Sequence, residues 1–414
     1  MRVAVLGAGV VGVTTAYQLL KDGHEVVVVE RNQGAADETS FGNAGMIAPG
    51  HAFAWASPKV PRILLKSLLD DTQAFRFRFR ADRAFWSWTL RFLGECTNAR
   101  ARENTRRKFT LCAYSQTVLH ETVAETDIEY ERGAGGLLYF YRSQESLDRG
   151  VANRGILVER GLEQEVVDRD RAAELEPALA PVKERIAGGV YCHTDESGDC
   201  HIFTQALARK CAEMGAEMRY GTTVDRLEVD GDRVVKAVTD RGDVTADAFV
   251  LALGCQSPFL LRPHGVKLQV QPIKGYALTV PIDGRNNPPR IGGVDEDNLT
   301  AYTPMGDRLR VTAKAEFAGY DTSHQPRDFA KMLSVLRELF PDAGNYDKAN
   351  HWAGLRPMTP EGTPILGRAK QSNLYLNTGQ GHMGWTMSHG SARITADLIA
   401  GRTPAIALDG MTLN

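Results

Sequence analysis

Three groups of residues in this chain have the types and spacing needed to bind a small charged molecule and to act on it. The first is a glycine-rich turn, GAGVVG at residues 7–12, with an acid, Glu30, at the end of the next apolar run. The second is an arginine, Arg356, in the sequence GLRP. The third is another glycine-rich stretch, GQGHMG at residues 379–384. Backbone N–H groups suit phosphates, and a guanidinium suits a carboxylate.

Each part of the first group has a physical role in binding a dinucleotide. Gly7 allows a tight turn, and Gly9 lets the backbone approach a pyrophosphate. Gly12 lets a helix pack close to the preceding strand, so that the first N–H groups of the helix point at phosphate. Glu30 is placed to accept hydrogen bonds from a ribose diol. The alternative, an N-terminal signal peptide, lacks a clean small-residue cleavage site.

The elements that must position these residues follow from the hydrophobic pattern. Residues 3–6 predict a short strand, and the residues after the turn have helical spacing. Residues 26–29 are continuously apolar, which is typical of a strand buried on both faces of a parallel sheet. Residues 248–254 predict another buried strand, and residues 268–280 alternate like a strand of an antiparallel sheet. Helices are predicted over 98–126 and from Trp385 to the neighbourhood of residue 399.

Two stretches near the turn each allow two interpretations. Residues 31–57 form a long loop rich in Gly, Ala and Ser. Loops of this length are usually functional, although a plain surface loop is the alternative. Residues 59–69 mix apolar and basic side chains, and aromatic and basic residues continue to Phe92. The region 59–80 therefore predicts either peripheral contact with an anionic inner membrane or a lid packed on a second domain.

The composition is that of an ordinary globular protein. The chain is 43% hydrophobic and 24% charged, and its net charge of −2 gives no reason to expect a nucleic-acid partner. Six cysteines lack metal-ligand spacing, so we expect reduced thiols in a cytoplasmic protein and no metal site. No apolar run approaches the about 18 residues of a membrane span.

The turn alone does not distinguish NAD from FAD. An NAD enzyme needs catalytic acids or bases beyond its Rossmann unit, whereas this chain has a strand ending at Gly254 and the glycine-rich stretch at 379–384 before a helix. That stretch directs N–H groups and a positive helix end at an anionic target. The flavin N1/C2=O locus, which becomes negative on reduction, is such a target. The alternative is a loop whose glycines serve only a tight turn.

Motifs along the whole chain resemble the D-amino-acid dehydrogenase family of the D-amino-acid oxidase, glycine oxidase and sarcosine oxidase superfamily. They are GAGVVG…E, TSFGNAGMIAPG, ADAFVLALG, PIKGY, WAGLRPMTPEGTPILG and NTGQGHMGWTMSHG. The resemblance implies a non-covalent FAD enzyme that transfers a hydride from the α-carbon of an amino acid to flavin N5. The resulting imine hydrolyses to a 2-oxo acid and ammonia, and the electrons leave to a quinone or other respiratory acceptor.

The resemblance also implies which residues hold the cofactor. Sarcosine oxidases attach their flavin through a cysteine in the C-terminal part, and no cysteine follows Cys255 here, so covalent attachment of that type is not expected. The expected cofactor-binding residues are Gly7, Gly9, Val10, Val11, Gly12, Glu30, Arg31, Ser40, Asn43, Ala44, Gly45, Met46, Val224, Gly254, Gly379, Gly381, His382, Met383, Gly384 and Trp385.

Three residues are predicted to face the substrate. Arg356 resembles the carboxylate-binding arginine of the superfamily, and its planar charged fork pairs bidentately with a carboxylate. The alternative is a surface salt bridge. Tyr276 and Tyr302 lie on the sheet expected to cover the flavin, and the alternative for both is a place in the core. His201 and His382 are further candidates, although a lone histidine is more often structural.

We therefore predict an α/β fold: a Rossmann-like FAD-binding domain with a second α+β substrate domain built on an antiparallel sheet. The FAD-binding domain takes residues 1–80, 190–265 and 350–414, and the substrate domain takes 81–189 and 266–349. The expected function is FAD-dependent oxidative deamination of D-amino acids. The alternatives are a glycine-, sarcosine- or D-hydroxyproline-type oxidase that uses O2, and a non-catalytic flavoprotein.

Overall fold

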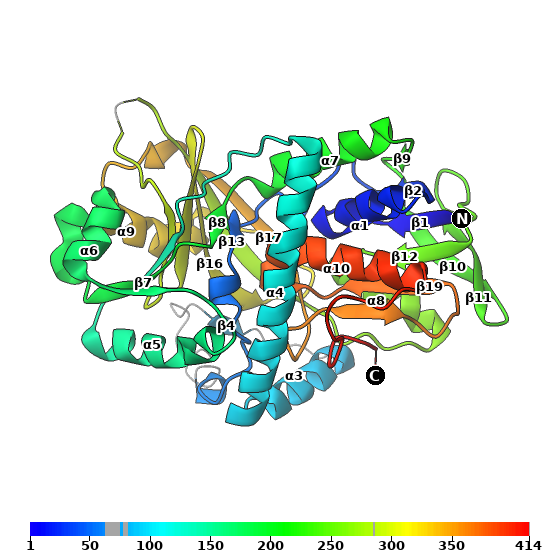
Figure 1. Cartoon of the computed structure of the whole chain (residues 1–414), viewed down its shortest axis with the longest axis horizontal. Coiled ribbons are helices and arrows are strands. Elements are labelled where there is room, and N and C mark those ends of the chain that lie inside the picture. The colour runs from blue at the N-terminus through cyan, green and yellow to red at the C-terminus, as the bar shows by residue number, and fades with distance from the viewer. Residues whose placement is uncertain (63–74, 78–81, 285, 414) are drawn as a thin grey trace.

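The computed structural model describes residues 1–62, 75–77, 82–284 and 286–413. Most of the region predicted to touch a membrane or to form a lid, residues 59–80, lies outside the described residues. Within them, two large sheets of six and nine strands dominate the fold (Figure 1). Two short sheets complete it, one of them formed by β3 (Met46–Ile47) and β8 (Glu196–Ser197).

The six-stranded sheet has the order β18-β19-β12-β1-β2-β9, and all its pairs are parallel except β18 with β19. The strands predicted at 3–6 and 26–29 pair at its centre, which confirms them. Its members are β1 (Arg2–Leu6), β2 (Glu25–Val29), β9 (Glu217–Arg219), β12 (Ala248–Leu251), β18 (Ile365–Arg368) and β19 (Leu374–Thr378).

Both faces of this sheet are covered, which explains its continuously apolar strands. One face carries Val3, Val5, Val26 and Val28 and packs on helices. These helices are α1 (Val10–Lys21), α7 (Cys200–Glu213) and α10 (Gly384–Ile399). The opposite face packs on a hairpin and a short helix, namely β10 (Val224–Asp230), β11 (Arg233–Thr239) and α8 (Ser257–Leu261).

The nine-stranded sheet is mostly antiparallel, with parallel pairs between β14 and β5 and between β16 and β4. Strand β5 lies between β14 and β7, both remote from it in sequence. Strand β17 also belongs to this sheet, although the predicted boundary at residue 350 placed it with the other domain. The members are β4 (Phe75–Phe77), β5 (Leu137–Tyr141), β6 (Glu165–Asp168), β7 (Gly188–Cys192), β13 (Gln271–Pro281), β14 (Gly292–Asp295), β15 (Thr300–Met305), β16 (Arg308–Phe317) and β17 (Asn350–Met358).

The long helix α4 (Asn98–Thr126) has the predicted bounds and crosses α10 (Figure 1). Thr97 caps it, because the Thr97 side chain accepts a hydrogen bond from the Arg100 N–H. The remaining α-helices are α3 (Arg83–Glu95), α5 (Gln144–Val158), α6 (Arg169–Leu175) and α9 (Ala330–Leu339). Short 3-10 helices are η1 (Pro49–His51), η2 (Pro177–Arg185), η3 (Gly254–Gln256), η4 (Arg262–His264), η5 (Pro326–Phe329), η6 (Tyr346–Lys348) and η7 (Gly381–Met383).

All six cysteines are free thiols, as the sequence predicts. Among the described helices, none combines the length and the apolar composition needed to cross a bilayer. The crossing of α4 over α10 is unusually close at one point. A Cβ added to Gly390 would lie 2.9 Å from the Cα of Ser115.

We predict that Gly390→Ala destabilises the protein because the new methyl group would meet the α4 backbone. Overpacking of this kind costs about 1–3 kcal/mol, which a lower urea midpoint of unfolding would show. Gly155→Ala is the matched control, because nothing lies within 4 Å of a Cβ there and the residue is inside α5. It should stabilise by about 0.4–1 kcal/mol. Equal effects of the two substitutions would contradict the close crossing.

Candidate active site

A cavity of about 680 Å³ lies where the two large sheets meet. On one side its wall is formed by residues that follow β1, β2 and β12, and on the other by residues of β13 and β17. Ligands of open α/β sheets bind beyond the carboxyl ends of the strands, which is this position. The volume is typical of a pocket for a small-molecule ligand or cofactor.

The glycine turn has one position open to a ligand and two closed by the fold. Gly7 has φ of +106°, and a Cβ there would lie 2.7 Å from the Ala252 carbonyl oxygen. A Cβ on Gly12 would lie 1.9 Å from the Gly7 carbonyl oxygen. A Cβ on Gly9 would meet only Ser40 Oγ, at 3.6 Å, and Gly9 lines the cavity. Gly7 and Gly12 thus build the turn, and Gly9 leaves its backbone accessible.

Glu30 lies directly after β2 and is tied to the same turn. Its Oε2 accepts a hydrogen bond from the Ala8 N–H at 2.8 Å, and its Oε1 accepts one from the Asn32 N–H at 2.9 Å. Burial raises the pKa of the Glu30 carboxyl, and the two N–H groups oppose that shift. The carboxylate is therefore held at the end of the cavity that is next to the start of α1.

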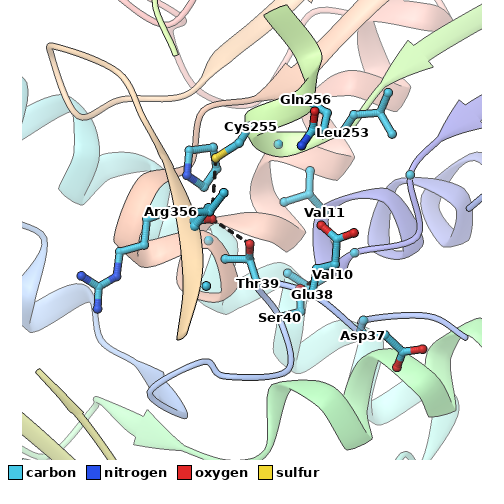
Figure 2. Close-up of a pocket in the computed structure, with 18 of the residues that line it drawn as sticks. Val10, Val11, Asp37, Glu38, Thr39, Ser40, Leu253, Cys255, Gln256 and Arg356 are labelled. Atoms are coloured by element: carbon cyan, nitrogen blue, oxygen red, sulfur yellow. Dashed lines mark hydrogen bonds between the residues drawn. The ribbon is translucent and has the colours of Figure 1, made fainter. Parts of the chain in front are cut away.

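The loop after Glu30 connects the two sheets. The Val10 N–H donates to Ser40 Oγ at 3.1 Å, and the Thr39 hydroxyl donates to the Leu355 carbonyl at 2.7 Å. Figure 2 shows the Thr39 and Cys255 side chains making hydrogen bonds to that one carbonyl from opposite sides. Figure 2 also shows Val10 and Val11 beside this loop, at the start of α1. The loop is thus built into the cavity wall.

Arg356, on β17, presents a guanidinium to the cavity and points away from Thr39 and Cys255 (Figure 2). Its Nη1 donates to the Lys314 carbonyl at 3.2 Å, and it forms no ion pair with any described carboxylate. A Cβ on Gly275 would lie 2.6 Å from the Arg356 Cζ, so that glycine makes room for the fork. Burial lowers the pKa of Arg356 to about 10, which leaves it charged at pH 7. A cation in this position fits a bound carboxylate.

The two tyrosines predicted to face the substrate occupy different places. Tyr276 lines the cavity, and its hydroxyl donates to Glu316. Tyr302 is fully buried in the core of the nine-stranded sheet, where its ring packs on Phe340, and it does not line the cavity. His201 also lies off the cavity wall, beside Asp37.

The C-terminal glycine stretch lines the cavity through Gly381, His382 and Gly384. His382 stacks on Trp55 with ring centroids 4.6 Å apart, and its Nε2 lies 3.3 Å from the Nζ of Lys108. Burial lowers the pKa of His382 well below its usual value, and Lys108, Arg356 and His51 add to that shift. The imidazole is therefore neutral at pH 7. Helix α10 begins two residues later, at Gly384.

Most of the predicted cofactor residues meet at this cavity. Those that line it are Gly7, Gly9, Val10, Val11, Glu30, Arg31, Ser40, Asn43, Ala44, Val224, Gly254, Gly381, His382, Gly384 and Trp385. Those that do not line it are Gly12, Gly45, Met46, Gly379 and Met383. Gly12 supports the turn, and Gly45 N–H donates to Asn43 Oδ1 at 2.8 Å.

Two residues near the cavity escaped the sequence reasoning. Trp352 lies on the cavity wall. A Cβ on Gly42 would lie 2.0 Å from its indole, and a Cβ on Gly354 would lie 1.9 Å from it. Only glycine at these two positions leaves space for the ring. Its place in the WAGLRP motif was an available signal. Lys108 is 1% exposed inside α4. The only sequence feature that could have indicated its burial is its position four residues before Cys112, which lies on the apolar face of the same helix.

These residues fit FAD. Gly9 and the first N–H groups of α1 would hold the pyrophosphate, and Glu30 a ribose. Leu355, Arg356 and His382 line the same cavity, and these residues would contact the flavin ring and a small substrate. The cavity wall contains both polar groups and aromatic rings. Polar groups suit the phosphates and ribose of a dinucleotide, and aromatic rings suit a large flat ring.

We predict different effects of alanine at two glycines of the turn. Gly9→Ala should leave the urea midpoint of the FAD-free protein unchanged, because its Cβ meets no backbone. It should weaken FAD binding by about 1–3 kcal/mol, roughly 5- to 150-fold, because the methyl group enters the ligand space. Gly12→Ala should lower the midpoint of the FAD-free protein as well. Fluorescence titration with FAD and urea unfolding measure both, and unaltered FAD affinity in Gly9→Ala would contradict this site.

Comparisons with known proteins agree with this geometry. The D-amino acid dehydrogenase 2 of Mesorhizobium japonicum is 48% identical over 412 residues, which cover 99% of this chain and 99% of the relative. The D-amino acid dehydrogenase of Paramagnetospirillum magneticum is 44% identical over 415 residues, which cover 100% of this chain and 98% of the relative.

Solved structures show the same fold. The crystal structure of glycine oxidase from Geobacillus kaustophilus superposes with a TM-score of 0.78 at 22% identity, and the match covers 100% of this chain and 98% of the other. The model of the FAD dependent oxidoreductase (DAO) family matches residues 2–398. The chain with this glycine turn, this cavity and this match therefore belongs to the DAO family of FAD-dependent oxidoreductases.

Proposed function

We propose that this protein oxidises D-amino acids to 2-oxo acids and ammonia. The observation that carries the proposal is the guanidinium of Arg356, which faces the cavity without a carboxylate partner among the described residues. An amino-acid substrate supplies that carboxylate. Relatives named D-amino acid dehydrogenase, at 48% and 44% identity over the full chain, support the D-amino-acid substrate class.

The side chains of the cavity would bind and orient the substrate. Arg356 would hold the carboxylate through two parallel hydrogen bonds, which fixes one end of the molecule. Tyr276, restrained by its hydrogen bond to Glu316, and Trp352 would exclude water from the α-carbon. FAD, when bound, would supply the acceptor for the hydride that leaves the α-carbon. The chain's own contribution is then orientation and electrostatics, which removes much of the barrier without a strong base at the α-carbon.

The cofactor contacts predicted from the sequence are part of the proposal. Gly9, Val10 and Val11 would contact the pyrophosphate through their backbone, and Glu30 the ribose of the adenosine. Val224 at the start of β10 would contact the adenine. The segment from Gly381 to Trp385 would contact the pyrimidine side of the flavin. Tyr302, which is buried away from the cavity, would act only by supporting the sheet.

We further propose that the electrons pass to a quinone while the protein contacts the cytoplasmic face of the inner membrane. Helix α3 exposes Trp86, Leu90 and Leu93 at helical spacing, with exposed fractions of 37, 70 and 37%. A hollow beside this helix contains four cationic side chains, Arg91, Arg100, Arg107 and Lys267, and two acidic ones. Apolar side chains next to an excess of positive charge complement an anionic lipid surface.

A substrate assay with an arginine variant tests the catalytic proposal. Anaerobic mixing with D-alanine or other D-amino acids should bleach the flavin absorbance of the wild type. Arg356→Met should keep FAD but weaken substrate binding by about 1.5–3 kcal/mol, roughly 10- to 150-fold, because a charge-assisted contact is lost. Arg368→Met, an exposed strand arginine away from the cavity, is the control. Loss of FAD in Arg356→Met would contradict the role, and peroxide formation in air would favour the oxidase alternative.

Co-sedimentation with vesicles tests the membrane proposal. Leu90→Glu with Leu93→Glu should reduce binding to phosphatidylglycerol vesicles, because burial of each leucine contributes about 1.5–3 kcal/mol. Flavin bleaching by the substrate should not change. Val235→Glu, on an exposed apolar residue of β11, is the matched control and should bind like the wild type. Equal binding of the α3 variant and the control would contradict this surface.

A further inference from the structure

A buried lysine and a histidine form a connected pair at the wall of the cavity. Lys108 lies in the middle of α4 and is 1% exposed. Its Nζ donates to the Phe53 carbonyl at 2.9 Å and lies 3.3 Å from the Nε2 of His382. No described carboxylate pairs with it. A buried amine without a counterion is costly to charge, so this position is unusual for a purely structural lysine.

His382 connects this lysine to the space where a substrate would lie. It lines the cavity, and its ring is held in place by stacking on Trp55. Its Nε2 faces Lys108, and its Nδ1 has no partner among the described residues. An imidazole can accept a proton at one ring nitrogen while it releases one from the other. The imidazole therefore has one nitrogen available to accept a proton and another placed to pass one to Lys108, as a proton relay requires.

The proposed reaction creates a need for such a relay. An amino acid binds as a zwitterion, and its ammonium nitrogen has no lone pair. The α-hydrogen can leave with its electron pair only after that nitrogen becomes neutral, because the lone pair stabilises the developing cation. Arg356 binds the other end of the substrate, and it lies close enough to His382 to affect its charge state.

We propose that His382 and Lys108 form a proton relay that removes the ammonium proton of the bound substrate, an inference that rests on the proposed function. An N–H bond of the ammonium group breaks, and its proton passes to Nδ1 of His382. The proton on Nε2 passes to the neutral amine of Lys108, which becomes an ammonium group. The substrate nitrogen keeps the electron pair of the broken bond, and nothing is oxidised in this step.

The surroundings of Lys108 suit an acceptor. Burial lowers the pKa of Lys108 to about 8, with a small opposing effect of Cys112 on the same helix. The other titratable groups around the pair are His51 on η1, Asp195 beside Cys112, and Arg356 across the cavity. The neutral amine is therefore present above about pH 8. Deamination at low substrate concentration should rise as the pH increases through that value.

A pH profile of flavin reduction tests the relay. In anaerobic stopped-flow mixing with D-alanine, the wild-type rate should rise with a midpoint near pH 8. Lys108→Arg keeps the charge, and because a guanidinium stays protonated near pH 8 it cannot accept a proton there. Its midpoint should move to that of the free substrate ammonium, with a rate at pH 8 lower by roughly 100-fold. His382→Gln, a milder change, should behave like Lys108→Arg.

His389→Gln is the matched control, because His389 is a buried histidine of α10 that does not line the cavity. It should keep the wild-type profile. A wild-type midpoint in Lys108→Arg and His382→Gln would overturn the relay, even if both are less stable. If no D-amino acid bleaches the wild-type flavin at any pH, the proposed function itself fails.

A binding measurement checks Lys108 without turnover. Propionate has the carboxylate of D-alanine but no amine. Its negative charge, which Arg356 would hold in the same cavity, should raise the pKa of Lys108, so wild-type FAD-bound protein should take up protons when propionate binds at pH 8.5. Calorimetry in buffers of different ionisation enthalpy measures that uptake. Lys108→Arg should show none, and uptake equal to the wild type would overturn the assignment of Lys108.

Discussion

The close approach of helix α1 to the end of β1 is the constraint on which the rest of the structure depends. Gly12 sits so near the Gly7 carbonyl that no Cβ fits, and Gly7 in turn lies against the Ala252 carbonyl at the end of β12. This contact directs the start of α1 over the carboxyl ends of the parallel strands. The carboxylate of Glu30 is bonded to the Ala8 N–H of the same turn. One compact unit thus provides a positive helix end, an open backbone at Gly9 and an acid.

The second sheet turns this binding unit into a site with room for a substrate. Strands β13 and β17 pair along their length, so Gly275 lies across from Gly354 and close to the Arg356 guanidinium. The loop after Glu30 then connects the sheets through the Thr39 hydrogen bond to the Leu355 carbonyl. The Arg356 cation, the rings of Tyr276 and Trp352 and the glycine turn share one cavity as a result. The end of the cavity at Arg356 is positive, which suits a carboxylate.

Three basic groups at or beside this cavity differ in charge because burial shifts the pKa of each by a different amount. Arg356 remains a cation because a guanidinium tolerates burial, whereas His382 becomes neutral. Lys108 lies between these cases, since an amine loses its proton more readily than a guanidinium when it is desolvated. The three groups therefore have different tasks available to them. Arg356 keeps a positive charge that suits an anion, whereas His382 and Lys108 can exchange protons.

The sequence by itself determined the local units and the chemistry of several residues. Short apolar runs predicted the strands at 3–6 and 26–29, and apolar residues at helical spacing predicted the helix at 98–126, because both patterns depend only on neighbouring residues. Tertiary structure decided which residues meet. Tyr276 and Tyr302 lie on strands of one sheet, yet only Tyr276 faces the cavity. Lys108 comes to His382 because α4 packs on α10, a contact between residues 274 positions apart. Long-range packing of this kind leaves no periodic pattern in the chain.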